Sequence, residues 1–499
     1  MKIKLIKLIQ NELIKIFKRR SSYILFIILV VAIIAFNYIE LNKENTKIKI
    51  DTSNLIESEI EEVLDNKEIG TESYVSQKNT IDFAKLYNRY KENSWQRYAL
   101  NEERKTYSVY DFPTDFYRDV QSTINTINDY EYNYETEINE QEYSRAKEKY
   151  EEYIKVLDEG DWKQFVSLKI KNLTEIKKQF DTTSDESKSI DIEIGLYKYR
   201  LQYNIEFKND ILNEYIENLR ESQYLLEYHN SNPTYYKEEI QREIKDVSLY
   251  KYVIENKIEL DISSDSNLIL GNTLNARTLF LRTFENFNIL VIIVVIYISS
   301  NIIIEERNKG TIKNLFIKPH KRVEILISKI LACIITVIIT MVFIVLIQYI
   351  VGGILFGFNS YSVSYIGYNF NNNQVFTMNL FQYLLLDGLA KLPMYIFVII
   401  FCIFIGTINS NITMTIILIL ITFIIFNTVI AEWSKYEGLT FIAKYFITNN
   451  WNFSKYLFGA SSNLSGQTPL FSLIVYLVYT LILLSLTINR FIRKDVYNE

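Results

Sequence analysis

Residues 305–329 read EERNKGTIKNLFIKPHKRVEILISK and form a short charged segment between two hydrophobic runs, 287–304 and 330–358. This segment cannot lie in hydrocarbon, because charged side chains and unpaired backbone groups are costly there. It is also too short to fold as a domain of its own. We therefore expect it to be a contact element at the membrane surface.

The rest of the chain alternates between apolar and polar regions. The 499 residues are 48% hydrophobic and 23% charged, but the charges are concentrated outside a set of apolar runs. Six runs approach the roughly 20 residues that cross a bilayer, and they span 22–39, 287–304, 330–358, 392–408, 412–431 and 470–489. The predicted fold class is an all-α polytopic membrane protein with one span before a large polar insert and five spans after it.

The same pattern gives the expected domain boundaries. The first apolar run is longer than a signal-peptide core and lacks a small-x-small cleavage pattern, so we expect it to be retained as a span. The predicted parts are an amphipathic interfacial helix at 1–20, the first span at 21–41, a mostly helical extracytoplasmic domain at 42–285, five spans within 286–490, and a cytoplasmic tail at 491–499.

Basic residues near the ends of the spans predict the orientation. Residues 1–20 and 305–329 each carry seven Lys or Arg, and such clusters favour the cytoplasmic side. Arg490 and Arg493 at the end of the last span agree, since six spans place both termini on one side. We therefore expect a multi-pass protein of the cell membrane with both termini in the cytoplasm and the acidic domain 42–285 outside.

The first twenty residues have the pattern of an amphipathic helix. One side carries Lys4, Lys7, Asn11, Lys15 and Lys18, and the other carries Leu5, Ile6, Ile9, Leu13, Ile16 and Phe17. A basic face of this kind suits anionic lipid headgroups, so membrane lipid is an expected partner. The alternative is that these lysines only set the topology of the first span.

Helical spacing also runs through the extracytoplasmic domain. Apolar positions from Glu140 to Leu157, followed by Gly160 and Asp161, predict a helical hairpin with a stop and a cap between its two helices. A turn is expected at 231–233, and loops are expected at 42–80 and 180–189. The many tyrosines are typical of an AT-rich genome, and we interpret them mainly as core residues.

The residue types that carry most enzymatic chemistry are scarce. The chain has two histidines and two cysteines, with no cluster spaced for a metal. It contains no G-x-x-x-x-G-K-[ST] phosphate loop and no G-x-S-x-G elbow. We therefore expect a protein that is not an enzyme by itself, binds no metal or cofactor and has no nucleic-acid partner.

Three polar residues in the second half are candidates for a transport pathway or gate. Asp387 and Lys391 are four residues apart and can pair on one helix face, while Glu432 follows the fifth apolar run. The alternative is that the fourth span begins at Leu392 and that all three residues are interfacial. Residues 433–469 are too apolar for an ordinary loop, and we expect them to form a re-entrant helical hairpin at the outer end.

The segment that opens this section also carries a family resemblance. The stretch Glu306-Arg307-Asn308-Lys309-Gly310-Thr311, followed by Leu315, Pro319, Arg322 and Lys329, lies in the loop after the second span. In this position it resembles the coupling loop of the type-2 ATP-binding-cassette exporter permeases. The resemblance covers about residues 1–41 and 286–490, and the insert between them has no such likeness.

The resemblance implies how such a chain would work. The coupling loop would dock on a separate ATPase subunit that binds ATP and Mg, and a second copy or a related permease would complete the working unit. The residues implied for the loop are Glu305, Glu306, Arg307, Gly310, Thr311, Pro319, Arg322 and Lys329. The cargo would be a peptide, an antibiotic or a lipid-like molecule.

Two other functions fit the same layout of spans. One is a non-transporting membrane protein of the phage-infection-protein or type VII secretion accessory kind, which would have no partner ATPase. The other is a sensor whose outer domain binds a ligand, although no cytoplasmic output domain is evident in the sequence.

Overall fold

The computed structural model describes residues 2–46, 69–109, 112–132, 139–262, 274–309, 321–409, 411–462, 464 and 466–493. The chain divides into two compact units. The membrane unit comprises residues 1–46, 262–267 and 272–499, and the insert unit comprises residues 47–261 and 268–271. Both units are built of helices, which confirms the predicted all-α class. The insert unit ends before the expected boundary at residue 285, because the short helices that follow residue 272 belong with the spans.

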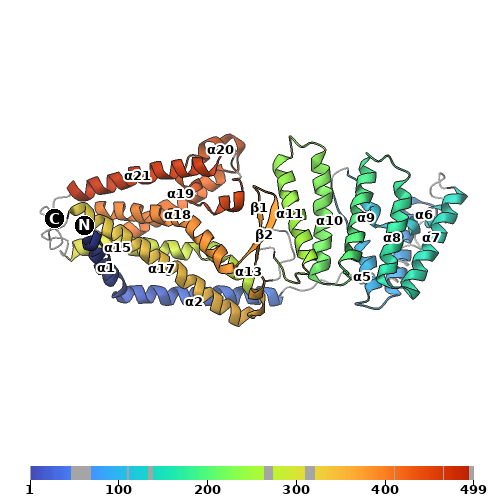
Figure 1. Ribbon diagram of the computed structural model, residues 1–499, viewed down its shortest axis with the longest axis horizontal. Coiled ribbons are helices and arrows are strands. Elements are labelled where there is room, and N and C mark those ends of the chain that lie inside the picture. The colour runs from blue at the N-terminus through green and yellow to red at the C-terminus, as the bar shows by residue number, and fades with distance from the viewer. Residues whose placement is uncertain are drawn as a thin grey trace. The chain divides into compact units, whose positions relative to one another are not determined.

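Six helices among the described residues are long and apolar enough to cross a membrane, in agreement with the sequence. They are α2 (Arg20–Thr46), α15 (Asn288–Asn308), α17 (Arg322–Phe356), α18 (Leu380–Ile408), α19 (Ile412–Trp433) and α21 (Pro469–Arg493). The helix α1 (Lys2–Phe17) and the C-terminal end of α21 lie at the same end of the membrane unit (Figure 1). We call this the inner end and the opposite one the outer end.

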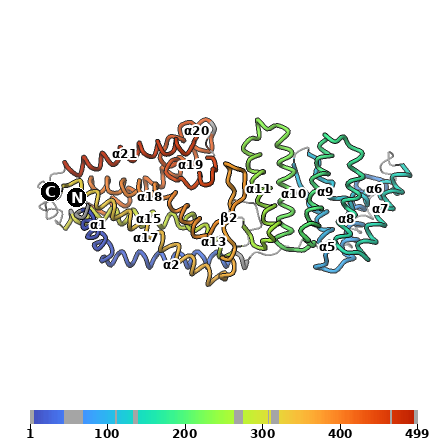
Figure 2. The backbone as a smooth tube through the Cα atoms, viewed as in Figure 1, coloured from blue at the N-terminus to red at the C-terminus, as the bar shows by residue number. Residues whose placement is uncertain are grey.

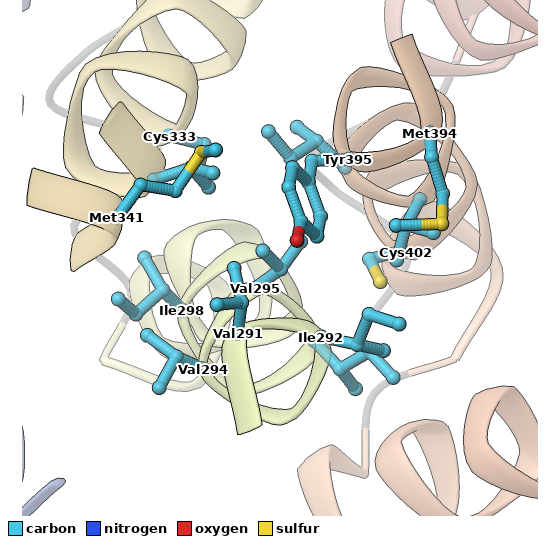
Figure 3. Packing of buried hydrophobic residues seen from close by; sticks show 14 of the residues in the cluster. Val291, Ile292, Val294, Val295, Ile298, Cys333, Met341, Met394, Tyr395 and Cys402 are labelled. Atoms are coloured by element: carbon cyan, nitrogen blue, oxygen red, sulfur yellow. The ribbon is translucent and has the colours of Figure 1, made fainter. Parts of the chain in front are cut away.

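The second span, α15, occupies the centre of the membrane unit. It is the most buried of the six spans, whereas α2 and α19 expose most of their residues. Its valines and isoleucines pack against α17 and α18, where Figure 3 shows Cys333, Met341, Met394, Tyr395 and Cys402 around them. The Tyr395 hydroxyl also donates to Asn288 Oδ1 over 2.9 Å. These contacts place the apolar part of α15 in the core of the membrane unit.

The fourth span begins earlier than the sequence suggested. The apolar run suggested a start at Leu392, but α18 begins at Leu380 and contains Pro393 within it. Asn379 caps the helix by accepting from the backbone of Phe381. Proline is tolerated inside membrane helices because neighbouring groups satisfy the freed backbone. Asp387 and Lys391 therefore lie inside this helix.

The outer end contains short elements between the spans. They are α13 (Ala276–Leu281), α14 (Thr283–Asn286), η2 (Asn359–Ser362), β1 (Tyr365–Asn369), β2 (Gln374–Met378), α20 (Glu437–Ala443), η3 (Ile447–Asn449) and η4 (Ser454–Gly459). The buried Arg277 side chain of α13 donates to the carbonyl oxygens of Val363 and Ser364 over 2.9 and 2.7 Å. This arginine fastens the entry to the second span onto the chain that leads from the third span into β1.

The two strands form an antiparallel hairpin that the sequence analysis did not predict. Tyr365 lies opposite Met378, and Asn369 lies opposite Gln374. The connecting turn is rich in asparagine, and Asn373 has a positive φ of 53°, which asparagine tolerates better than most residues. The segment 433–469 also differs from the expected helical hairpin, because it holds one seven-residue α-helix and two 3-10 helices.

The insert unit is a series of helices and one 3-10 turn. Its elements are α4 (Glu72–Asn88), α5 (Trp95–Glu102), η1 (Asp115–Tyr117), α6 (Asp119–Glu131), α7 (Glu140–Glu159), α8 (Trp162–Lys177), α9 (Asp185–Gln202), α10 (Ile211–Asn230) and α11 (Lys237–Glu255). The predicted hairpin is α7 and α8, with Gly160 ending one helix and Asp161 capping the next. The loop predictions were partly wrong, because α4 occupies 72–80 and α9 begins at 185; residues 47–68 lie outside the described part of the chain.

Buried ions hold the insert unit together along with its apolar core. Arg220 Nε lies 2.9 Å from Glu193 Oε1, and both side chains are almost fully enclosed. Arg200 pairs with Glu102, and Lys169 pairs with Glu103. Both cysteines of the chain lie in the membrane unit, so the insert unit has no disulfide. The enclosed ion pairs between α5, α8, α9 and α10 thus add directional contacts to the apolar packing of these helices.

Candidate functional site: an ion network at the inner end

The helix α1 presents a buried face that includes one acid. Leu8, Glu12 and Ile16 are spaced four residues apart and are all buried, and Glu12 is only 3% exposed. Residues with this spacing lie on one side of a helix. The face is directed against α17, which α1 contacts extensively. A carboxylate in the middle of this face requires a cation from the neighbouring helices.

Two lysines supply that positive charge. Glu12 Oε2 lies 2.9 Å from Lys329 Nζ on α17, and Glu12 Oε1 lies 2.8 Å from Lys15 Nζ on α1. The same two lysines hold Glu306 of α15, at 2.7 Å for Lys329 and 2.6 Å for Lys15. We call these four residues the inner ion network. Its two carboxylates and two ammonium groups balance in charge and join three helices.

Burial and charge act in opposite directions within this network. Burial alone would raise the pKa of Glu12, but the Lys329 and Lys15 ammonium groups outweigh it and hold that pKa below its usual value. For Lys15, burial alone would lower the pKa, but its hydrogen bonds to Glu12 and Glu306 outweigh burial and raise it. Both groups are therefore ionised near neutral pH, and each depends on the opposite charges beside it.

Further contacts extend the network toward the ends of the neighbouring helices. Arg19, between α1 and α2, lies 2.7 Å from Glu305, which also pairs with Lys309. Arg322, the first residue of α17, donates to the carbonyl oxygen of Ile492 in α21 over 2.6 Å. The polar residues at the inner end thus connect α1, α15, α17 and α21.

The network lies on both flanks of the segment 305–329, which we call the coupling segment. Glu305 and Glu306 stand at the end of α15, while Arg322 and Lys329 stand in the first turns of α17. The structure brings these four predicted residues to the inner end. Gly310, Thr311 and Pro319 lie outside the described residues, as does the side chain of Arg307.

A second polar cluster lies near the outer end. Lys391 Nζ pairs with Asp387 Oδ2 over 2.7 Å, as their spacing suggested, and both side chains are buried. The Ser454 hydroxyl of η4 donates to Asp387 Oδ1 over 2.6 Å, and the Phe453 amide donates to the Ala390 carbonyl over 3.0 Å. We call Asp387, Lys391 and Ser454 the outer cluster.

The third candidate for a pathway residue is separate from this cluster. Glu432 is exposed near the end of α19 and pairs with Lys435 over 2.7 Å, a residue only three positions away. The contacts found for Glu432 thus link it to no other span. Among the described residues, no group of three or more His, Cys, Asp and Glu side chains is arranged to hold a metal ion.

Sequence reasoning named Lys15, Glu306 and Lys329 but not Glu12. Glu12 shares a face with Leu8 and Ile16 and therefore interrupts an apolar stripe. That interruption was the available signal. Ser454 carried no comparable signal, because a serine in an irregular segment has no periodicity to violate.

Comparison with known proteins agrees with this architecture. Residues 6–496 match the ABC-2 family transporter protein, so the match includes both the spans and the insert. The uncharacterized protein YhcI of Bacillus subtilis (strain 168) is 26% identical over 270 residues, which cover 52% of this chain and 82% of that protein. No solved structure was found to match the chain. The chain belongs to the ABC-2 family of transporter membrane proteins.

Proposed function

We propose that this chain is the permease subunit of an ATP-driven exporter and that its coupling segment docks on a separate ATPase subunit. The family match supports a membrane component of an ABC transporter. ATP and Mg would bind to the partner, since the sequence has no phosphate loop. The inner end would then face the cytoplasm, in keeping with its basic residues.

The inner ion network is the observation that carries this proposal. Lys329 lies at the C-terminal flank of the coupling segment and is fully buried, and its ammonium group contacts Glu306 on the other flank and Glu12 of α1. A displacement of the coupling segment by the ATPase subunit would therefore move α15, α17 and α1 together. Buried charges resist separation, because an ion that loses its partner in a low-dielectric site is costly.

The working unit in this proposal contains two permeases, identical or related. A single bundle fills its own interior with the apolar side chains around α15, and few residues of α2 and α19 are buried within it. A pathway for a sizeable cargo would then form between two chains. Closed two-fold assemblies are the commonest arrangement of soluble oligomers built from like subunits, and we expect the same symmetry here.

The cargo class and its exit are also part of the proposal. The insert unit is larger than a connection between spans requires, and its acidic character would favour a cationic peptide or antibiotic over an anion. The outer cluster would help to close the outer end, because it attaches η4 to α18 through Ser454. The cargo would leave when that attachment opens.

Co-purification from native membranes tests the central part of the proposal. The intact chain, carrying an affinity tag, should bring down an ABC ATPase in near-equal amount, and the complex should hydrolyse ATP. Lys329→Met should reduce both the amount of bound ATPase and the rate. Lys435→Met is the matched control, because it removes an exposed ion pair at the other end of the spans. A wild-type chain that binds no ATPase would contradict the proposal.

A further inference from the structure

A pair of amide side chains lies buried between the first and third spans. Asn37 Nδ2 donates to Gln348 Oε1 over 2.8 Å, and Gln348 Nε2 donates back to Asn37 Oδ1 over 3.0 Å. Asn37 Nδ2 also donates to the carbonyl oxygen of Ile33. Both side chains have no exposed surface. We call Asn37 and Gln348 the amide pair.

This pair is unusual for its surroundings. Asn37 follows the apolar run 24–36 in α2, and Gln348 lies between Ile347 and Tyr349 in an apolar stretch of α17. An amide in hydrocarbon is costly unless its hydrogen bonds are satisfied. The reciprocal bonds satisfy that demand in one register only, since a slide of one helical turn, about 5.4 Å, would separate the two amides. The pair therefore fixes the register of α2 on α17.

At the inner end, an ion pair also joins the N-terminal part of the chain to α17. Glu12 of α1, which leads into α2, pairs with Lys329 near the start of α17. The two attachments are 19 residues apart along α17, about 28 Å of helix. The extensive contacts of α2 with other described elements are with α17 and α1. Span 1 is thus held to span 3 near both ends, and it packs little against the rest of the bundle.

The helix α17 connects the coupling segment at the inner end with the amide pair near the outer end. The helix begins at Arg322, at the C-terminal end of the coupling segment, and continues without a proline to Phe356. At the outer end, α2 runs through Asn37 to Thr46, where the chain passes into the insert unit. A displacement that enters at the start of α17 would therefore reach α2 through Gln348 and Asn37, as far as Thr46.

We propose that Asn37 and Gln348 are positioning residues that keep α2 and α17 moving as one arm, and that this arm transmits the state of the ATPase to the insert unit. This inference rests on the proposed function. It assigns the first span to energy coupling, and it predicts that the insert unit moves in response to the ATPase during the transport cycle.

A distance measurement on the full-length permease in its ATPase complex tests this proposal. Spin labels at the exposed positions Lys237 of the insert unit and Asn372 of the membrane unit would report their separation with and without ATP and vanadate. Dilution with unlabelled chains isolates distances within one chain. The separation should change in the wild type. Asn37→Leu and Gln348→Leu should each reduce the fraction of molecules that show the changed distance at least about threefold. This is the size expected for one lost hydrogen bond between membrane helices.

Two companion variants separate transmission from a general loss of structure. Asn37→Gln with Gln348→Asn keeps an amide on each helix and should retain most of the response. In a background with Cys333→Ala and Cys402→Ala, Asn37→Cys with Gln348→Cys can be joined by a short thiol cross-linker. Joining the two positions should leave both ATP hydrolysis and the distance change intact, because the arm is proposed to move as one body.

The possible failures are distinguishable within the same samples. A wild-type chain that captures no ATPase would contradict the proposed function and this inference with it. A complex that hydrolyses ATP, but whose distance change is the same in Asn37→Leu as in the wild type, would contradict the inference alone. Loss of hydrolysis on cross-linking would also overturn it, because the two helices would then have to separate during the cycle.

Discussion

The two ends of the membrane unit are held together by different kinds of contact. At the inner end, Glu12, Glu306, Lys15 and Lys329 join three helices through buried charges. At the outer end, the ion pair Asp387–Lys391 lies within one helix, and Ser454 contributes a hydroxyl from η4. Separating the inner helices exposes unpaired buried ions, whereas separating η4 from α18 breaks single hydrogen bonds and leaves the ion pair intact.

This difference indicates which end can open at low cost. A hydrogen bond contributes about 0.5–1.5 kcal/mol net, whereas removing one member of a buried ion pair costs about 3–5 kcal/mol. The inner end is therefore suited to move as one body under a partner's force. The outer segment 433–469 is suited to part from α18, as an exit for cargo requires.

The largest expected effect comes from Lys329→Met. The substitution leaves two buried glutamates with Lys15 alone, and it should lower the stability of the membrane unit by about 3–5 kcal/mol. Thermal unfolding in lipid nanodiscs measures the loss. Adding Glu12→Gln restores the charge balance, so the double variant should be more stable than Lys329→Met. If the second substitution instead adds to the damage, the four charges do not act as one network.

The sequence predicted the six spans well, because their length and lack of charge are local properties. The same holds for α7 and α8, whose boundary is set by Gly160 and Asp161. The contact between Glu12 and Lys329 could not be predicted, since it joins residues 317 positions apart and depends on how helices pack. The apolar run understated the length of α18, because Asp387 and Lys391 interrupt the hydrophobic pattern although they pair with each other inside the helix.

A smaller effect is expected at the outer end from Ser454→Ala. Loss of the hydroxyl that bonds to Asp387 should weaken the attachment of η4 by about 1 kcal/mol, or about fivefold in the opening equilibrium. A cysteine substituted for Tyr456 would report opening through its rate of reaction with a membrane-impermeant thiol reagent. Ser362→Ala is the control, because that serine is exposed and bonds within its own turn. Equal reaction rates in Ser454→Ala and the wild type would argue against a closing role for the cluster.

The inner network should also respond to acid. Because the pKa of Glu12 is lowered in the folded chain, its contribution to stability is present above the ordinary pKa of about 4.3 for a glutamate. That contribution is lost as pH falls through the lowered value. Hydrogen exchange of α1 should therefore be constant from pH 7 to 5, after correction for the intrinsic rate, and accelerate below about pH 4. The Glu12→Gln variant should show no such acceleration in α1.

A further effect of pH is expected in the insert unit at Glu243. Burial, with Asp246 nearby, raises the pKa of this carboxyl to about 7. A raised pKa stabilises the fold at low pH, and that stability is lost as pH rises through the folded-state value. Glu243→Gln should thus slow hydrogen exchange of α10 and α11 at pH 8 in the full-length chain and have little effect at pH 5. Glu238→Gln, on the exposed face of α11, should change neither.

The account's central claim is that residues 305–329 contact a separate ATPase, and site-specific photo-crosslinking tests it most directly. A photoreactive amino acid at Lys309 or Lys321, both exposed, should form cross-links in native membranes to a protein that mass spectrometry identifies as an ABC ATPase. The same probe at Asn371, on the β1–β2 turn, should give no such product. An ATPase cross-link from Asn371, or none from any position within 305–329, would contradict the account.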